Sequence, residues 1–285
     1  MTQPKDALQK WGETAKYWTN YSDAITEMFA PVTEALIGDA HIGEGQFVLD
    51  VAGGAGEPSL TIAERIGPTG TVMCTDAIAE MVEAARAEAA KRGLTNVEFR
   101  QCTAESLPFA DESFDVVVSR LGAMFFPDPL AACKEMLRVS KPGGTIAFVV
   151  WHKSELNPFC HIVSDVIARH VPADPPEPDA PDAFRFAELG KLASILSQAG
   201  ATDVTDKVLH FQMEAPVSAE QFWTIRSAVS ETLRSKLATL SSEEQTQVAR
   251  EVQESVRPYF PDDQMNFPTQ LIIVTGRKAQ KNAIL

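Results

Sequence analysis

A glycine loop directly after a short apolar strand constrains this 285-residue chain more than any other feature. The segment reads Val48-Leu49-Asp50-Val51-Ala52-Gly53-Gly54-Ala55-Gly56. Glu57-Pro58-Ser59-Leu60 follows as the expected start of a helix, with proline in its first turn. A second predicted strand ends at Asp76, about 20 residues after the loop. Strand, glycine turn, helix and acidic residue in this order are typical of an adenosine-containing cofactor site.

Composition and charge narrow the class of protein. A hydrophobic content of 45% allows a sizeable core. The sequence contains no apolar run of about 18 residues, so we expect no membrane-spanning helix. The opening residues, Met1-Thr2-Gln3-Pro4, begin no secretory signal, so we expect a cytoplasmic protein without stable membrane insertion. Four dispersed cysteines predict free thiols, and we expect no metal site. A net charge of −14 without a basic cluster disfavours nucleic acids and favours a small-molecule substrate.

Residues 47–151 alternate short Val/Ile-rich runs with helical stretches, which predicts an α/β fold with a mostly parallel sheet. Strands are expected at residues 47–51, 71–75, 97–100, 114–119 and 145–151. Helices are expected at 77–92 and from Asp128-Pro129 to the turn Lys141-Pro142-Gly143-Gly144. The remainder predicts a helix at 186–200, a strand at 204–213, helices within 218–256 and a last strand at 271–276.

We divide the chain into four parts: an N-terminal helical lid (1–44), a cofactor-binding core (45–151), a helical and proline-rich insertion (152–203), and a C-terminal part (204–285) that completes the same domain. The lid is expected to carry one apolar stripe, formed by Ile25, Met28, Phe29, Val32 and Leu36. Aromatic residues before it, from Trp11 to Tyr21, either anchor the first helix to the core or cover the ligand. Residues 171–183 contain five prolines and are expected to form an irregular connector.

The spacing of the glycines distinguishes two kinds of cofactor. A dinucleotide fingerprint, Gly-x-Gly-x-x-Gly, would need a third glycine where Ser59 stands. Glu57 is expected at the helix N-terminus, where its negative charge would repel a pyrophosphate. S-adenosylmethionine carries no phosphate and therefore fits this loop better. Asp76 would accept hydrogen bonds from both ribose hydroxyls, and Asp50 is expected to order the loop by accepting bonds from its backbone N–H groups.

Further motifs follow the loop in a fixed order. They are Asp76, Glu105-Ser106-Leu107-Pro108-Phe109, Ser113-Phe114-Asp115-Val116-Val117-Val118-Ser119 and Leu137-Arg138-Val139-Ser140-Lys141-Pro142-Gly143-Gly144. Together with the loop they resemble the class I S-adenosylmethionine-dependent methyltransferases, most closely the ubiquinone/menaquinone-biosynthesis C-methyltransferases and related small-molecule enzymes. The resemblance is strong over residues 47–151 and weak elsewhere. Ala52, where most class I loops have glycine, fits the ubiquinone-type group.

This resemblance implies a Rossmann-like sheet of seven strands in the order 3-2-1-4-5-7-6, with helices on both faces and an insertion after the fifth strand. It also implies the cofactor-binding residues. These are Asp50, Ala52, Gly53, Gly54, Gly56, Asp76, Ala77, Met81, Thr103, Ala104, Glu105 and Ser119. Many members have an aspartate where Thr103 stands, and that aspartate bonds the adenine amino group, so a threonine hydroxyl would accept the bond without charge. S-adenosyl-L-homocysteine would be the product.

Methyl transfer from a sulfonium is an in-line displacement, so positioning both reactants supplies much of the acceleration and no protein nucleophile is needed. His152, directly after the fifth predicted strand, is a candidate base or acceptor-binding group, or else a structural loop histidine. Arg120 follows the fourth strand, in the segment that borders the transferred methyl in the resembling family, unless it is a capping or ion-paired arginine. Candidate acceptor-contacting residues are Tyr17, Tyr21, Met124 and Trp151. Met124 equally suits the core.

The segment after the fourth predicted strand narrows the acceptor. Ser119-Arg120-Leu121-Gly122 stands where methyltransferases of DNA and amide nitrogens carry Asn/Asp-Pro-Pro-Tyr/Phe. We therefore expect a small, partly apolar or aromatic acceptor, methylated on oxygen, carbon or sulfur, and leave a monomer or a homodimer open. Two alternatives also stay open. One is a protein that binds S-adenosylmethionine without transferring its methyl, and the other is a Rossmann-type NAD(P)-dependent oxidoreductase.

Overall fold

The first predicted strand lies inside the sheet because its side chains are apolar on both faces. In the computed structural model, β1 (Phe47–Val51) lies between β2 (Thr71–Asp76) and β4 (Phe114–Arg120) and runs parallel to both. Val48 and Leu49 have no exposed surface, as a strand covered on both faces requires. The structure describes residues 4–172 and 179–280, with side chains from residue 11 onward.

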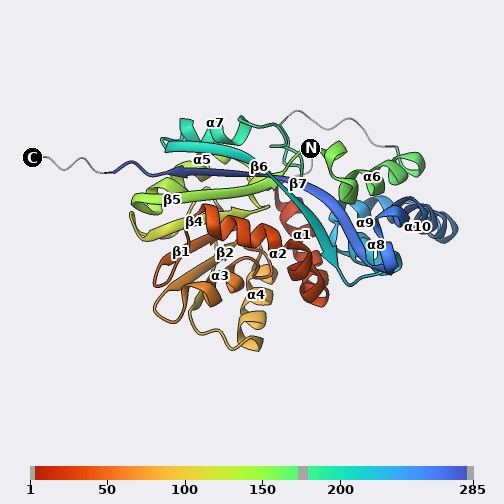
Figure 1. Cartoon of the computed structure of the whole chain (residues 1–285), viewed down its shortest axis with the longest axis horizontal. Coiled ribbons are helices and arrows are strands. Elements are labelled where there is room, and N and C mark those ends of the chain that lie inside the picture. The colour runs from red at the N-terminus through yellow and green to blue at the C-terminus, as the bar shows by residue number, and fades with distance from the viewer. Residues whose placement is uncertain (1–3, 173–178, 281–285) are drawn as a thin grey trace, which may run out of the picture. The chain divides into compact units, whose positions relative to one another are not determined.

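Seven strands form one sheet within the described residues, in the order β3-β2-β1-β4-β5-β7-β6 (Figure 1). The remaining strands are β3 (Val97–Gln101), β5 (Ser140–Trp151), β6 (Thr202–Ala215) and β7 (Met265–Arg277). Strands β1 to β5 pair in parallel, and β7 pairs antiparallel with β5. The predicted fold class and strand order are confirmed. The order reverses between β1 and β4, and open α/β sheets bind ligands at the carboxyl ends of strands beside such a reversal.

The described residues form two compact units. The first, which we call the sheet unit, comprises Val32–His152, Pro181–Leu209 and Leu271–Leu285 and contains the glycine loop. The second, which we call the helical unit, comprises Met1–Pro31, Lys153–Ala180 and His210–Gln270. The division that the sequence suggests at residues 44, 151 and 203 stays a prediction.

Helices of the sheet unit cover its strands (Figure 1). They are α3 (Ser59–Ile66), α4 (Ala79–Lys91), α5 (Pro129–Val139), α7 (Lys191–Gln198) and the short 3₁₀ helix η1 (Ala123–Phe125). Helices α3 and α4 pack against β2 and β3, whereas α5 packs against β5 and α7. The start of α5 agrees with the prediction, because the Asp128 carboxylate accepts a hydrogen bond from the Ala131 N–H at 3.0 Å.

The helical unit is built from helices that pack on one another. They are α1 (Pro4–Asn20), α6 (Pro158–His170), α8 (Ala219–Val229), α9 (Glu231–Leu237), α10 (Ser242–Val256), and the 3₁₀ helices η2 (Ser154–Leu156), η3 (Arg257–Tyr259) and η4 (Pro261–Asp263). Helix α10 packs against α6 and α8, and α1 against α8 and α9. Helix α2 (Ser22–Asp39) carries the predicted apolar stripe, and all five residues of the stripe are buried.

Three predicted boundaries are wrong by five or six residues. Strand β5 begins at Ser140, because the expected turn at 141–144 is an irregularity inside the strand, where the pairing with β4 shifts register. Strand β7 begins at Met265, six residues before the expected start at 271. Helix α7 begins at Lys191, preceded by Gly190 with a left-handed φ of 83°. The proline-rich connector contains no helix or strand at 171–172 and 179–183, and its remaining residues lie outside the described part of the chain.

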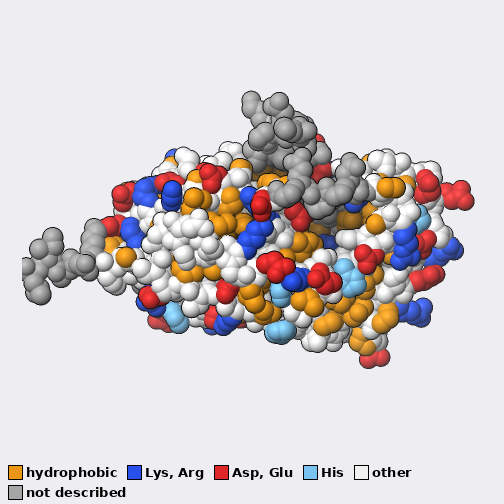
Figure 2. Space-filling model, turned by 90° about the horizontal axis from the view of Figure 1, so that it is seen from above, with side chains coloured by type: hydrophobic (Ala, Val, Ile, Leu, Met, Phe, Trp, Pro, Cys, Tyr) orange, Lys and Arg blue, Asp and Glu red, His pale blue; other side chains and the backbone are white. Residues whose placement is uncertain are grey.

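Two surface properties bear on the predicted partners. No helix in the described ranges is long and apolar enough to cross a membrane. On the face drawn in Figure 2, Lys and Arg side chains are interspersed with Asp and Glu side chains.

Candidate active site

Strand β1 delivers the glycine loop to the carboxyl edge of the sheet. The chain turns sharply there, because Ala52, Gly54 and Gly56 have φ angles of 59°, 57° and 118°. The Gly53 N–H donates to the Thr75 carbonyl at 2.8 Å, which attaches the loop to β2. The left-handed φ of Ala52 shows why glycine is common at this position, since a side chain there carries a modest steric cost.

Gly53 has no room for a side chain. A Cβ there would lie 2.7 Å from Asp50 Oδ2 and 2.8 Å from Cys74 Sγ. At Gly54, by contrast, a Cβ would have no neighbouring atom within 4 Å. The loop is therefore closed on the side of Gly53 and open at Gly54.

This difference predicts unequal effects for two similar substitutions. Gly53→Ala forces a methyl group against the Asp50 carboxylate, so we expect a loss of about 1–3 kcal/mol in unfolding free energy. Gly54→Ala meets no atoms and adds only left-handed strain, about 1 kcal/mol. Urea denaturation of both variants measures the difference, and equal losses would contradict close packing under Gly53.

Asp76 lies beside the loop, as the sequence predicts. Its Oδ2 accepts a hydrogen bond from the Gly54 N–H at 3.0 Å, and its Oδ1 accepts one from the Ile78 N–H at 2.9 Å. Burial raises the pKa of this carboxyl, whereas its backbone donors lower it. Each carboxylate oxygen can accept a further bond. The carboxylate is thus held in place with acceptor capacity left, and its contact with ribose stays a prediction.

Asp50 lies beneath the loop, but its partner differs from the one expected. Its Oδ2 accepts a hydrogen bond from the Ser59 hydroxyl at 2.7 Å, and its Oδ1 is buried without a partner. The expected bonds from backbone N–H groups are therefore wrong. Burial raises the pKa of Asp50 to about 7, and the nearby Asp76 and Glu57 charges add to this, against the opposing effects of Ser59 and Arg120. The loop thus rests on a carboxyl group that titrates near neutral pH.

Glu57 does not present the free negative charge that the sequence suggested. Its Oε1 lies 2.7 Å from Nη1 of Arg92, and its Oε2 accepts a hydrogen bond from the Thr61 hydroxyl at 2.8 Å. Helix α3 begins at Ser59, so Pro58 precedes the helix and does not lie in its first turn. The electrostatic argument against a pyrophosphate is therefore weaker than expected. The argument from the missing third glycine is unaffected.

Strand β4 ends with Ser119 and Arg120 beside the loop. A Cβ on Gly122 would lie 2.7 Å from the Ala52 Cβ and 2.8 Å from the Ser119 Oγ. That hydroxyl is buried and has no hydrogen-bond partner among the described atoms. Ser119 thus lies close to the first residue of the loop, and its contact with a cofactor stays a prediction.

Arg120 connects α2 to the start of α3. Its Nη1 donates to the Thr33 hydroxyl at 2.7 Å and its Nη2 to the Glu57 carbonyl at 3.1 Å. Burial lowers the pKa of this guanidinium, and the charges of Glu57 and Asp50 oppose that effect. These contacts support the alternative of a structural arginine, and a direct role toward the acceptor stays a prediction.

His152 follows Trp151 at the end of β5. The His152 Nδ1 lies 2.7 Å from the Ala187 carbonyl, which can only accept, so Nδ1 carries the proton. In the neutral ring Nε2 is then the basic nitrogen. Trp151 is 7% exposed. The structure fixes the tautomer that a base would need, while catalysis by His152 stays a prediction.

The segment that is predicted to border the adenine lies next to Asp76. The Cys102 N–H donates to the Asp76 carbonyl at 3.0 Å, which places the following segment beside it. In this segment Thr103 is exposed, Ala104 is buried and Glu105 is half-buried. Ala77 directly follows Asp76, and Met81 is buried in α4. Their contacts with a cofactor stay predictions.

The predicted acceptor residues are not all in one unit. Met124 is 1% exposed in η1, which favours its interpretation as a core residue. Tyr17 and Tyr21 belong to the helical unit. There the Arg234 guanidinium lies over the Tyr17 ring, 5.1 Å from its centroid. Their contact with an acceptor stays a prediction.

Sequence reasoning missed Thr33, Arg92 and Gly122. Thr33 and Arg92 act through partners 87 and 35 residues away, and no local pattern marks them. Gly122 left a usable signal, because a glycine just past a strand end often marks a close approach of two backbones.

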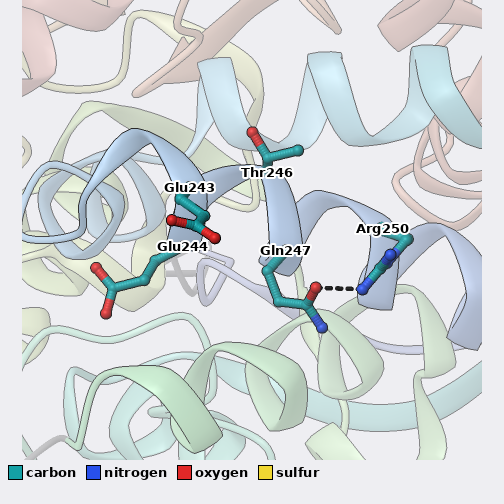
Figure 3. A pocket seen from close by; sticks show the side chains of 5 residues that line it. All are labelled: Glu243, Glu244, Thr246, Gln247 and Arg250. Carbon is teal, nitrogen blue, oxygen red and sulfur yellow. Dashed lines mark hydrogen bonds between the residues drawn. The ribbon is translucent and has the colours of Figure 1, made fainter.

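A hollow on α10 lies apart from all the predicted site residues in the sequence. It has a volume of about 460 Å³ and is lined by Glu243, Glu244, Thr246, Gln247 and Arg250, all from this one helix (Figure 3). Arg250 donates a hydrogen bond to the Gln247 side chain. Its lining is polar, exposed except for the half-buried Gln247, and offers no convergent chemistry, so we assign the hollow no role.

The family model described as a methyltransferase domain matches residues 42–171. Residues 42–171 of this chain, a little under half of it, thus form a methyltransferase domain. The matched residues include the glycine loop, Asp76, Arg120 and His152. The predicted family, which uses S-adenosylmethionine, is thereby confirmed for this domain.

Individual proteins are also similar to this chain in sequence or in fold. An uncharacterised protein of Mycobacterium tuberculosis is 44% identical over 133 residues, which cover 46% of this chain and 47% of that protein. A ubiquinone/menaquinone biosynthesis C-methyltransferase of Xanthomonas oryzae is 42% identical over 106 residues, covering 37% of this chain and 42% of the enzyme. The chain thus matches less than half the length of these relatives. The crystal structure of a putative methyltransferase from Bacillus halodurans has the same fold, with a TM-score of 0.55 and 21% identity over 87% of this chain and 99% of the other.

Proposed function

We propose that this protein transfers the methyl group of S-adenosylmethionine to a small, partly apolar or aromatic acceptor. The observation that carries the proposal is the junction of the glycine loop with Asp76, where the Gly54 N–H bonds the carboxylate at 3.0 Å. This junction brings a bare stretch of backbone and an oriented acceptor group together at the carboxyl edge of the sheet. A nucleoside that carries a short amino-acid chain in place of a phosphate needs both features.

The residues present fit this cofactor. Gly54 is open where a Cβ would stand, so backbone approach to the methionine part meets no side chain there. Asp76 keeps acceptor capacity for two ribose hydroxyls. Thr103 and Ala104 would border the adenine. When bound, the cofactor supplies an electrophilic methyl on a sulfonium, and loss of that positive charge drives the displacement.

The chain's own contribution is positioning and, for an acidic acceptor, removal of a proton. Holding two reactants in line replaces a bimolecular encounter and lowers the barrier substantially. His152 would take a proton at Nε2 from a phenol, thiol or activated carbon, because its Nδ1 is committed to the Ala187 carbonyl. The quinone-biosynthesis enzyme of Xanthomonas oryzae supports an acceptor of phenolic or quinone-like character. We include a cytoplasmic location in this proposal and disfavour nucleic-acid substrates on the net charge of −14.

Asp76→Ala tests the cofactor assignment. We expect S-adenosylmethionine binding to weaken by roughly 1–3 kcal/mol, because the ribose hydroxyls lose a charged acceptor. Isothermal titration calorimetry measures this, with Glu64→Ala as the control that removes the same charge from an exposed site on α3. Unchanged affinity in Asp76→Ala, with the fold intact, would contradict the ribose assignment.

The competing functions differ in measurable ways. Thermal unfolding with S-adenosylmethionine and with NAD separates a methyltransferase from an oxidoreductase, and we expect stabilisation by the former alone. Transfer of labelled methyl to a panel of phenols, thiols and quinols then separates an enzyme from a protein that only binds the cofactor. Binding without transfer to any member would favour the binding protein.

A further inference from the structure

Arg138, in α5, binds the irregular segment that follows β3. Its Nη2 donates to the Leu107 carbonyl at 2.8 Å, and its Nη1 donates to the Phe109 carbonyl and to Asp111 Oδ1, each also at 2.8 Å. Its Nε and Nη2 donate to the two carboxylate oxygens of Glu135 at 2.7 and 2.8 Å. A guanidinium has five N–H donors, so every donor of Arg138 has an acceptor.

Glu135 adds a bond to the same segment from the same helix. Its Oε2 accepts a hydrogen bond from the Leu107 N–H at 3.0 Å, so side chains of α5 bond both backbone polar groups of Leu107. Leu107 is 4% exposed, and a buried backbone group without a partner would be costly. The hydrogen bond from Arg138 lowers the pKa of Glu135, so the carboxylate is ionised at pH 7. The pair takes the place of a neighbouring strand for residues 102–113, which contain no helix or strand.

The segment that α5 holds is the one predicted to border the adenine. Leu107 follows Thr103 closely in the sequence, and the Ser106 N–H donates to the Thr103 carbonyl at 3.2 Å, which closes a turn between them. Before this turn, the Cys102 N–H donates to the Asp76 carbonyl at 3.0 Å. Thr103 thus lies in a turn that is attached to Asp76 on one side and to α5 on the other.

We propose that Arg138 is a positioning residue for recognition of the adenine base, and that it acts by fixing the turn at Thr103. This inference rests on the proposed function, because it takes the cofactor to be S-adenosylmethionine with its adenine beside Thr103. Thr103 is exposed, so its place depends on the backbone of the turn. A hydrogen bond weakens steeply when its geometry is distorted, so Thr103 recognises the amino group only while the turn is held. The contact also gives one joint role to two sequence motifs, at 105–109 and 137–144.

Two ligands test base recognition: S-adenosyl-L-homocysteine and its analogue in which hydrogen replaces the adenine amino group. Calorimetry on the full chain should show that the wild type binds the parent compound about tenfold more tightly, as one hydrogen bond predicts. Arg138→Met fills similar space without donors and should reduce this preference to about twofold or less. A general loss of stability would weaken both affinities equally and leave the preference unchanged. Arg65→Met is the matched control, because it removes an arginine from an exposed ion pair with Glu34 and should keep the full preference.

Two further variants complete the test. Glu135→Ala removes the acceptor of the Leu107 N–H and the anion that orients Arg138, so it should reduce the preference in the same way and decides the matter if Arg138→Met does not fold. Arg138→Lys keeps the charge but lacks the planar fork, so its preference should be intermediate. Full preference in folded Arg138→Met or Glu135→Ala would overturn the proposal and leave the proposed function intact. A wild type that binds both compounds equally would also overturn it, and one that binds neither would overturn the proposed function as well.

Discussion

Asp50→Asn should stabilise the protein by about 2–4 kcal/mol at pH 8 and have almost no effect at pH 4. Asp50 is fully buried, and one of its carboxylate oxygens has no partner. Burial is the largest cause of its raised pKa of about 7. Asparagine is nearly isosteric and neutral, and its side-chain oxygen can still accept the Ser59 hydroxyl bond.

The sign follows from proton linkage. The folded-state pKa of Asp50 is about 7 and the unfolded value is near 3.8, so the folded protein binds more protons between these values. The unfolding free energy contributed by this group is therefore highest below pH 4, falls as the pH rises, and is constant above about pH 8. Burial destabilises the fold only when Asp50 is ionised, so the neutral asparagine side chain does not cause this loss of stability.

Urea denaturation of wild type and Asp50→Asn at pH 4, 6 and 8 measures the difference. Subtracting the two curves removes the contributions of other titrating groups, except those that interact with Asp50. Asp76 gives both proteins a slope of the same sign, since burial also raises its pKa, and only its interaction with Asp50 survives the subtraction. Glu64→Gln, at an exposed position on α3, should show no such pH-dependent difference. A difference between Asp50→Asn and wild type that stays constant from pH 4 to pH 8 would contradict the raised pKa.

The parts of the fold that the sequence predicts correctly are those set by local pattern. β1 is a short apolar run bounded by a glycine loop, and it appears with the expected limits, Phe47–Val51. The early start of β5 was missed, because Gly143 and Gly144 indicate a turn unless the pairing across to β4 is known. The early start of β7 is not predictable either. Its first six residues lack the uninterrupted apolar pattern that predicts the rest of the strand. Long-range pairing, invisible to local pattern, set these boundaries.

The candidate site divides in the same way. The loop glycines and Asp76 carry their signals in spacing, and the structure brings them together. The sequence does not reveal that the Glu57 charge is paired, because its partner Arg92 lies 35 residues further along the chain. Asp50 lies beneath the loop as expected, but its Ser59 partner is not predictable, since the sequence marks Ser59 only as the place of a missing glycine. Local pattern predicts the candidate site, and partners that are distant in the sequence set the electrostatics of its residues.

Substitution of Arg120, which bonds residues far apart in the sequence, should have the second large effect on stability. It links Thr33 of α2 to the Glu57 carbonyl before α3, and its charge lowers the pKa of Asp50. Removing it leaves a hydroxyl and a carbonyl without that donor and removes a cation that moderates the buried carboxyl. We expect Arg120→Met to lose about 2–4 kcal/mol of unfolding free energy.

Thr33→Val is the control for this loss, because it removes the acceptor of the Nη1 bond and leaves the charge in place, and it should cost only about 1 kcal/mol. Arg120→Lys keeps the charge, but lysine lacks the planar guanidinium that reaches both acceptors. The stability of this variant should therefore lie between those of the wild type and Arg120→Met. If Arg120 acts by holding the loop, stability and S-adenosylmethionine affinity fall together across the three variants. If it instead contacts the acceptor, turnover falls in Arg120→Met while stability and cofactor affinity stay near the wild-type values. Denaturation, calorimetry and labelled-methyl turnover on the same preparations therefore decide between a positioning residue and a catalytic one.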